Sequence, residues 1–424
     1  MVMRISTRTI FDTGSMQITS LSSAMARTQQ QLSTGRKNLT AADDPIASSR
    51  ALEVTQSQSL NTQLATNRSN AKGVLGIETT ALSSTTSLLQ DIKDLAVKSG
   101  NGTYTDADRE SVAIELEGKL ADLMGIANTA DGVGGYVFSG YKSTTLPFTK
   151  TATGADYQGD QGQRSLQVGT TRTVPITDSG SSVFEANQTG NGTFVTKPDP
   201  GNYGRGGSGI ISAGSVKDAT QVLPGHNYQI SFQVVPATAG VPKATTYTVT
   251  DMTDPANPVP VPPTPVPAVP QAYVSGQNIS FDGVQFDVQG DPADGDSFTV
   301  EPSTKQSVFT TVQSFIDQLR QPGSGPAGQA SLNNMLNQLQ VNIDNAAENV
   351  SSVNSAVGAR LKELDYLDSS GDDAGLQYAS TLSTLQDLDY TAAISLFTQQ
   401  QTTLTAAQKS FTTMSGLSLF NYIS

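Results

Sequence analysis

The sequence predicts an α+β fold in which both termini form an elongated, discontinuous α-helical coiled coil or bundle, with a mainly β lobe inserted in the middle. Heptad-like apolar spacing runs through the first and last parts of the 424 residues. Between them, apolar and polar residues alternate in short runs, as in half-buried strands. Of the 20 prolines, all but Pro45, Pro322 and Pro326 lie in this middle region, which argues against long helices there.

The N-terminal part is expected to be helical in three stretches. A first helical stripe ends at Gly35 and is formed by Ile18, Leu21, Met25, Thr28 and Leu32. Asp44 suits an N-cap and Pro45 the first position of a long helix that ends near Ser99. Thr105 and Asp108 resemble a capping box that begins a third helix.

The C-terminal part shows the strongest helical periodicity. A short amphipathic helix covers 308–319, and a 3–4 apolar alternation extends from Leu332 to Leu367, as in coiled coils and bundles. Ser370 to Asp373 are expected to interrupt it. In the last segment, one stripe contains Phe397, Leu404, Phe411 and Met414. A second stripe on the same helix, with Leu385, Leu388, Ala392 and Leu396, requires more than one neighbouring helix.

The middle of the chain is predicted to form strands at 165–168, 228–234 and 284–288. Pro255 to Pro270 form a proline-dense connector that should be extended. Three domains are therefore expected. Residues 1–42 and 376–424 form a terminal assembly domain, 43–142 and 303–375 a helical rod domain, and 143–302 an outer β-rich domain with an insertion at 186–274.

Composition excludes several classes of function. A net charge of −13 and an isoelectric point near 4.5 argue against nucleic-acid binding, which needs clustered basic residues. The absence of cysteine and the single His226 exclude disulfides, thiolate sites and multi-histidine metal centres. No apolar run approaches the ~20 residues of a membrane span, and the N-terminus lacks the apolar segment of a cleaved secretory signal. We expect no cofactor and no membrane partner.

Candidate catalytic or metal sites have simpler structural interpretations. The Asp43–Asp44 pair is better explained by capping than by acid–base catalysis. Asp291, Asp294 and Asp296 lack a complete calcium-loop signature and are expected in a polar turn. His226 is expected to be an exposed turn residue, and the glycine-rich stretch 201–209 a flexible loop. The sequence thus predicts no active site and no enzymatic activity.

One N-terminal segment resembles the signature of bacterial flagellins and their relatives. It extends from Leu32 to Pro45, and its signature residues are Leu32, Ser33, Gly35, Ala41, Ala42, Asp43, Asp44 and Pro45. Four further segments are more similar to the hook–filament junction family, hook-associated protein 3, than to flagellin. These segments are Tyr136–Gly140 with Pro147-Phe148, Tyr157–Asp160, Val183-Phe184, and Ser418–Ile423.

The resemblance implies an extracellular structural protein of the flagellum, exported unfolded through the type III apparatus without a cleaved signal. It implies a ring of like subunits between the first hook-associated protein and flagellin, and an export chaperone that binds the C-terminal helix. Flagellin itself is the nearest alternative. A coiled-coil scaffold whose outer lobe binds a ligand is the second alternative.

The terminal segments are expected to remain poorly ordered until like subunits cover their apolar stripes, because isolated helices are marginal in water. They would then form an antiparallel pair. Opposite charges support this pairing, since residues 1–40 are basic overall and residues 360–424 acidic. The expected assembly interface consists of Leu21, Met25, Leu32, Leu385, Leu388, Leu396, Phe397, Leu404, Phe411, Met414, Leu417, Leu419 and Phe420.

Overall fold

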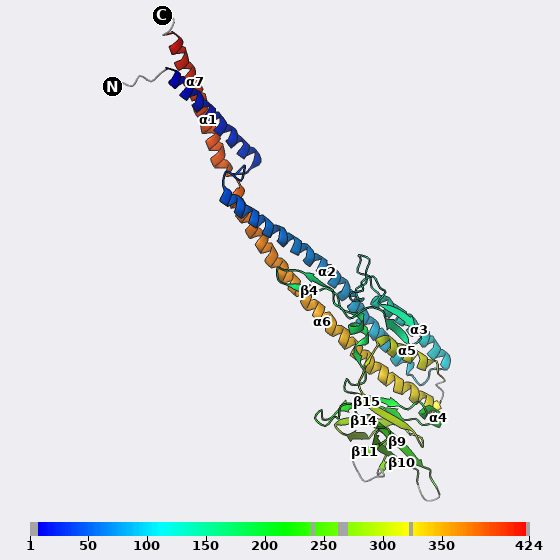
Figure 1. Ribbon diagram of the computed structural model, residues 1–424. Coiled ribbons are helices and arrows are strands. Elements are labelled where there is room, and N and C mark those ends of the chain that lie inside the picture. The colour runs from blue at the N-terminus through cyan, green and yellow to red at the C-terminus, as the bar shows by residue number, and fades with distance from the viewer. Residues whose placement is uncertain (1–6, 239–241, 262–269, 322–324, 421–424) are drawn as a thin grey trace. The chain divides into compact units, whose positions relative to one another are not determined.

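Helices at both ends of the chain flank a β-rich middle, as the sequence predicted (Figure 1). The computed structural model describes residues 7–238, 242–261, 270–321 and 325–420. The chain divides into two compact units, one of Met1–Asn67 with Asp365–Ser424 and one of Arg68–Leu364. We call these the terminal unit and the central unit. Helices α2 (Pro45–Ser99) and α6 (Gly325–Gln386) contribute residues to both.

In the terminal unit, helices α1 (Thr7–Thr34) and α7 (Tyr390–Phe420) lie side by side and antiparallel (Figure 1). At one end, Arg36 forms an isolated antiparallel bridge with Asp387. At the other end, the rings of Phe11 and Phe411 are in contact, with centroids 4.9 Å apart. The two chain termini are therefore paired through helices that lie more than 350 residues apart in the sequence.

The expected interruption at Ser370–Asp373 is wrong, because α6 continues through it to Gln386. A glycine inside a helix costs only about 1 kcal/mol, and the carbonyl of the buried Gly371 accepts a hydrogen bond from Asn61 Nδ2 of α2 at 2.7 Å. The break comes instead after Gln386. There Asp389 caps α7, since the Ala392 N–H donates to its Oδ1 at 3.0 Å.

This break also corrects the prediction that Leu385, Leu388, Ala392 and Leu396 form a second stripe on one helix. Leu385 belongs to α6, Leu388 lies between the helices, and Leu396 belongs to α7. Because the helix is interrupted between Gln386 and Tyr390, these residues do not lie on one continuous helical face.

The central unit contains the rest of α2 and α6, together with α3 (Asp106–Ala127), α5 (Val308–Leu319), the one-turn α4 (Asn202–Arg205) and a π-helix η1 (Ser181–Glu185). The predicted capping box of α3 is confirmed: the Asp108 N–H donates to the Thr105 hydroxyl, and the Thr105 N–H donates to the Asp108 carboxylate. The stretch 201–209, expected as a flexible loop, contains α4, whose Asn202 is buried.

A cluster of aromatic rings forms the core where α5, η1 and β1 (Phe148–Thr151) meet. Phe148 contacts Phe184 and Phe309 with ring centroids 5.5 and 4.9 Å apart, and Phe138 contacts Phe184 at 5.4 Å. All four side chains are essentially inaccessible to solvent. The conspicuous motifs at 136–140, 147–148 and 183–184 thus contribute buried residues to this core, with Tyr136 half-buried.

Sixteen strands are described in the middle of the chain. After β1 they are β2 (Gly154–Tyr157), β3 (Ser165–Gln167), β4 (Thr173–Pro175), β5 (Asn187–Gln188), β6 (Phe194–Pro198), β7 (Ile210–Ile211), β8 (Ser215–Val216), β9 (Tyr228–Val235), β10 (Ala244–Asp251), β11 (Val259–Val261), β12 (Gln271–Ala272), β13 (Asn278–Phe281), β14 (Val284–Gln289), β15 (Ser297–Pro302) and β16 (Lys305–Gln306). The three predicted strands correspond to β3, β9 and β14.

Two sheets enclose a second core. The larger has the order β11-β10-β9-β15-β6, with β12 beside β10, and the smaller has the order β13-β14-β7, with β8 beside β14. Phe232, Phe286 and Phe298 are buried in this core. Strand β15 pairs with both β9 and β6, so the expected insertion at 186–274 is not a separate structural part. In the proline-dense connector, β11 lies at the sheet edge, and 262–269 lie outside the described residues.

Candidate assembly surface

The terminal unit has almost no hydrophobic core of its own. Among its described residues, the buried apolar side chains are Ala51, Leu64, Ala393 and Leu404. The central unit, by contrast, buries two aromatic clusters. Helices that bury so little gain little stability from packing within the chain, and secondary structure alone is marginal in water.

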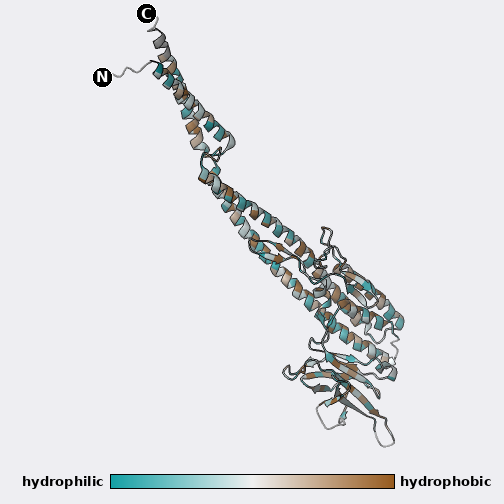
Figure 2. Ribbon diagram, in the orientation of Figure 1, coloured by the Kyte–Doolittle hydropathy of each residue, from teal (hydrophilic) through white to brown (hydrophobic). Residues whose placement is uncertain are grey.

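Large apolar side chains remain exposed on all four helices of the terminal unit. Figure 2 shows apolar residues distributed along α1 and α7 among polar ones. Met16 on α1 is 73% exposed, and Ile394 on α7 is 54% exposed. Among the side chains that the structure describes, the exposed set is Phe11, Met16, Ile46, Leu52, Leu60, Tyr366, Leu376, Tyr390, Ile394, Leu396 and Met414. Such an accumulation of exposed apolar side chains on one unit is typical of an interaction surface.

The residues predicted from the sequence as the assembly interface fall into four groups. Half-buried in the terminal unit are Leu21, Met25, Leu32, Leu385, Leu388, Phe397 and Phe411. Leu404 is buried, whereas Leu396 and Met414 are exposed. The side chains of Leu417, Leu419 and Phe420 lie outside the described part of α7. Leu396 and Met414 therefore remain the described members of the set that are most available to another subunit.

Several exposed residues were not predicted from the sequence, including Phe11, Met16 and Ile394. They lie beside the stripes that were recognised, and a single heptad stripe does not show which of two faces the neighbouring helix of the same chain occupies. The signal was present for Ile394, which lies three residues before Phe397 and therefore beside it on the helix surface.

The flagellin-like segment 32–45 joins α1 to α2 and also contacts the α6–α7 break. Gly35 adopts a left-handed φ of 68° after the last turn of α1. Its carbonyl accepts the N–H of Leu388 at 3.0 Å, and the N–H of Lys37 donates to the Gln386 carbonyl at 2.7 Å. These hydrogen bonds join the α1–α2 connection to the α6–α7 connection. The signature residues of this segment therefore have a structural role.

The two aspartates of this segment act as local caps. Asp43 accepts the N–H groups of Leu39 and Thr40 at 2.9 and 3.0 Å and pairs with Arg27 at 2.6 Å. The Thr40 N–H, with smaller contributions from Leu39 and Arg27, lowers the pKa of the Asp43 carboxyl. Asp44 accepts the Ala47 N–H at 2.9 Å, which is the predicted N-cap of α2. Both carboxylates are thus engaged in capping.

The residues of the other candidate sites also have structural roles. Asp291, Asp294 and Asp296 lie in the turn between β14 and β15, as expected. His226 is not a free turn residue, because its Nδ1 lies 2.5 Å from Asp251 Oδ2 and its side chain is 34% exposed. Within the described ranges, no three His, Cys, Asp or Glu side chains gather as a metal site. None of the described helices combines the length and apolarity that a bilayer crossing needs.

A stripe of amide side chains on α6 attaches the β-rich middle of the chain to the helices of the central unit. We call this middle part, residues 143–302, the β region. Asn334 Oδ1 accepts the Ile211 N–H at 2.8 Å, and Asn345 Nδ2 donates to the carbonyls of Gln188 and Gly190 at 2.7 and 2.8 Å. The stripe consists of Asn334, Gln338, Asn342, Asn345 and Asn349. These residues follow a 3–4 spacing in the sequence. The stripe was not predicted, because it runs beside the stronger apolar heptad pattern of the same helix.

The antiparallel terminal helices, the signature segment and the exposed apolar faces define a flagellin-like structural protein. Consistent with this, the profile of the bacterial flagellin N-terminal helical region matches residues 5–143. The chain is 27% identical over 419 residues to flagellar hook-associated protein 3 of Salmonella typhimurium, covering 99% of each chain. It also resembles the crystal structure of flagellar hook-associated protein 3 from Legionella pneumophila, with 30% identity, a TM-score of 0.70, and coverage of 78% of this chain and 98% of that one. The chain belongs to the flagellar hook-associated protein 3 family.

Flagellin matches a smaller part of the chain. Flagellin of Listeria monocytogenes is 31% identical over 137 residues, which covers 32% of this chain and 43% of that protein. The match to hook-associated protein 3 extends through the β region as well. The flagellin alternative is therefore less well supported.

Proposed function

We propose that this chain forms the hook–filament junction of the bacterial flagellum by packing the exposed apolar faces of α1 and α7 against like subunits. The junction role is that of its family. The sparse core of the terminal unit carries the proposal for the mechanism. Each large apolar side chain that a neighbouring subunit covers contributes roughly 1.5–3 kcal/mol.

Met16, Ile394, Leu396 and Met414 are the described residues that we assign to contacts between subunits. Leu404 and Phe411 instead support the pairing of α1 with α7, because Leu404 is buried and Phe411 lies on Phe11. Leu21, Met25, Leu32, Leu385, Leu388 and Phe397 are half-buried and remain proposed contributors to the assembled state, together with Leu417, Leu419 and Phe420.

The partners follow from this position in the flagellum. The first hook-associated protein would lie on the hook side and flagellin on the filament side, with copies of this chain completing the ring. Export without a cleaved signal, and a chaperone that covers the apolar C-terminal helix before assembly, complete the proposal. The role is structural and requires no catalytic residue.

The test compares two double variants in a deletion strain. Ile394→Asp with Met414→Asp should leave a helical, monomeric protein that cannot restore swimming, because both side chains are exposed in the single chain. Val235→Asp with Val274→Asp is the matched control, since these valines of the β region are 56% and 59% exposed. Motility assays and electron microscopy of the flagella give the readouts.

Restored motility with the α7 double variant would refute the assembly surface. The uncomplemented deletion strain separates the alternatives. A junction protein predicts hooks without filaments and flagellin in the medium, whereas loss of flagellin itself leaves none to shed. If antibodies against this protein label positions away from the flagellum, the coiled-coil scaffold would be favoured instead.

A further inference from the structure

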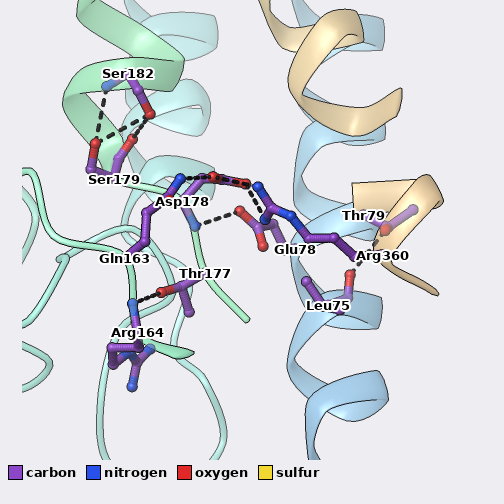
Figure 3. Close-up of polar contacts among 10 residues, drawn as sticks. All are labelled: Leu75, Glu78, Thr79, Gln163, Arg164, Thr177, Asp178, Ser179, Ser182 and Arg360. Atoms are coloured by element: carbon purple, nitrogen blue, oxygen red, sulfur yellow. Dashed lines mark hydrogen bonds and ion pairs between the residues drawn. The ribbon is translucent and has the colours of Figure 1, made fainter. Parts of the chain in front are cut away.

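A buried polar cluster joins three elements of the central unit (Figure 3). Glu78 comes from α2, Asp178 from the segment that follows β4, and Arg360 from α6. Glu78 has no solvent exposure, and Asp178 is 4% exposed. All three residues belong to the central unit, and none of them is among the residues assigned to assembly contacts above.

The hydrogen bonds of the cluster leave one carboxylate without a counter-ion. Arg360 donates to both oxygens of Asp178, with NH1–Oδ2 at 2.8 Å and NH2–Oδ1 at 3.1 Å. Gln163 Nε2 also donates to Asp178 Oδ1 at 2.6 Å. The guanidinium charge is thus matched by Asp178, and Glu78 would add a second, uncompensated negative charge.

Only one of the two carboxyl oxygens of Glu78 accepts a hydrogen bond. Its Oε1 accepts the N–H of Asp178 at 3.0 Å, while its Oε2 is buried without a hydrogen-bond partner (Figure 3). An uncompensated charge in this position is costly, and such groups take up a proton instead.

We propose that Glu78 holds a proton at neutral pH and that this proton makes the Glu78–Asp178–Arg360 cluster a pH-dependent latch. The latch fastens the segment 176–185, which follows β4 and contains η1, to α2 and α6. When the proton leaves, two carboxylates face one guanidinium in a buried place, and the attachment weakens.

The pKa of Glu78 is raised, as its burial and hydrogen bonding lead one to expect. Burial, reinforced by the charge of Asp178 and only partly offset by the Asp178 N–H and by Arg360, raises the pKa of Glu78 to about 8. The folded chain therefore binds a proton that the unfolded chain releases at ordinary carboxyl pH. Stability from this group is complete at acidic pH and falls as pH rises toward 8, by up to about tenfold in the folding equilibrium constant per pH unit.

The experiment compares the full-length wild type with Glu78→Gln and with Glu115→Gln, an exposed glutamate on α3 that controls for the loss of charge. Glutamine keeps the acceptor for the Asp178 N–H and supplies a permanent donor. Urea unfolding of the central unit, followed by near-ultraviolet circular dichroism from pH 5 to 9, gives the equilibrium constants.

The ratio of the Glu78→Gln constant to that of the wild type should grow by up to about tenfold per pH unit and level off above pH 8. Glu115→Gln should follow the wild type. Parallel profiles for wild type and Glu78→Gln would overturn the proposal. Carboxyl ¹³C resonances of the glutamate-labelled wild type give a second readout. The signal missing in Glu78→Gln should titrate near pH 8, and titration in the ordinary carboxyl range would also overturn it.

Discussion

The ring of Phe411 on α7 lies against the ring of Phe11 on α1, with centroids 4.9 Å apart and planes inclined by 45°. Gly14, one turn further along α1, provides the space for this contact. A Cβ at Gly14 would lie 2.8 Å from Cδ2 of Phe411. The aromatic pair and the glycine together fix how the N- and C-terminal helices lie against each other.

Gly14→Ala is therefore expected to have opposite effects in two backgrounds. In the wild type, the added methyl displaces the Phe411 ring, and overpacking of this kind costs about 1–3 kcal/mol. In a Phe411→Ala background the clash is absent, and alanine should stabilise the helix by roughly 0.8–1 kcal/mol. Thermal unfolding of the four chains by far-ultraviolet circular dichroism measures both effects. Stabilisation in both backgrounds would show that the ring does not rest on Gly14.

Gly35→Ala should weaken the connection between α1 and the α6–α7 break. The left-handed φ of 68° costs an L-residue about 1–2 kcal/mol, and the new Cβ would lie 2.8 Å from the Tyr390 hydroxyl. Gly73→Ala on α2 is the matched control, because no atom lies within 4 Å of its Cβ position. The control should be stabilising, since alanine is a better helix former. Comparable melting temperatures for the two variants would contradict this prediction.

Asn349→Ala should loosen the attachment of the β region to α6. Asn349 Nδ2 donates to the carbonyls of Ser182 and Val183 at 2.9 and 3.0 Å. Each such hydrogen bond contributes about 0.5–1.5 kcal/mol to stability. Asn337→Ala removes one longer bond, 3.4 Å to the Ile211 carbonyl, and should cost less. Urea unfolding of both variants gives the comparison, and an equal loss of stability would argue against the amide stripe as the attachment.

Asp43→Asn should destabilise the terminal unit at neutral pH but not in acid. The pKa of Asp43 is lowered in the folded chain, chiefly by the Thr40 N–H, so its stabilising effect is present above the ordinary carboxyl pKa and is lost as pH falls. Wild type and variant should therefore converge as the pH falls well below the ordinary carboxyl pKa. Asp372→Asn, at an exposed position of α6, controls for the charge. A difference independent of pH would show that the charge of Asp43 is not what stabilises the loop.

Local signals in the sequence were sufficient to predict the helices and several of their ends. Asp44 with Pro45 begins α2, and Thr105 with Asp108 begins α3, because a cap depends on residues within one turn. The family signature was likewise a contiguous segment. The continuity of α6 through Gly371 was not predictable, because the buried carbonyl of that glycine finds its partner on another helix at Asn61.

By itself, the sequence determined the class of fold, the apolar character of both termini and the resemblance to flagellar proteins, because these depend on periodicity and short motifs. Tertiary structure alone decided which apolar residues remain available for partners. Phe411 is half-buried against Phe11, whereas Met16 and Ile394 are exposed, although α1 and α7 both carry apolar stripes. It also brought Glu78 and Asp178 together across 100 residues. Burial and charge pairing depend on contacts distant in the chain, which no local pattern specifies.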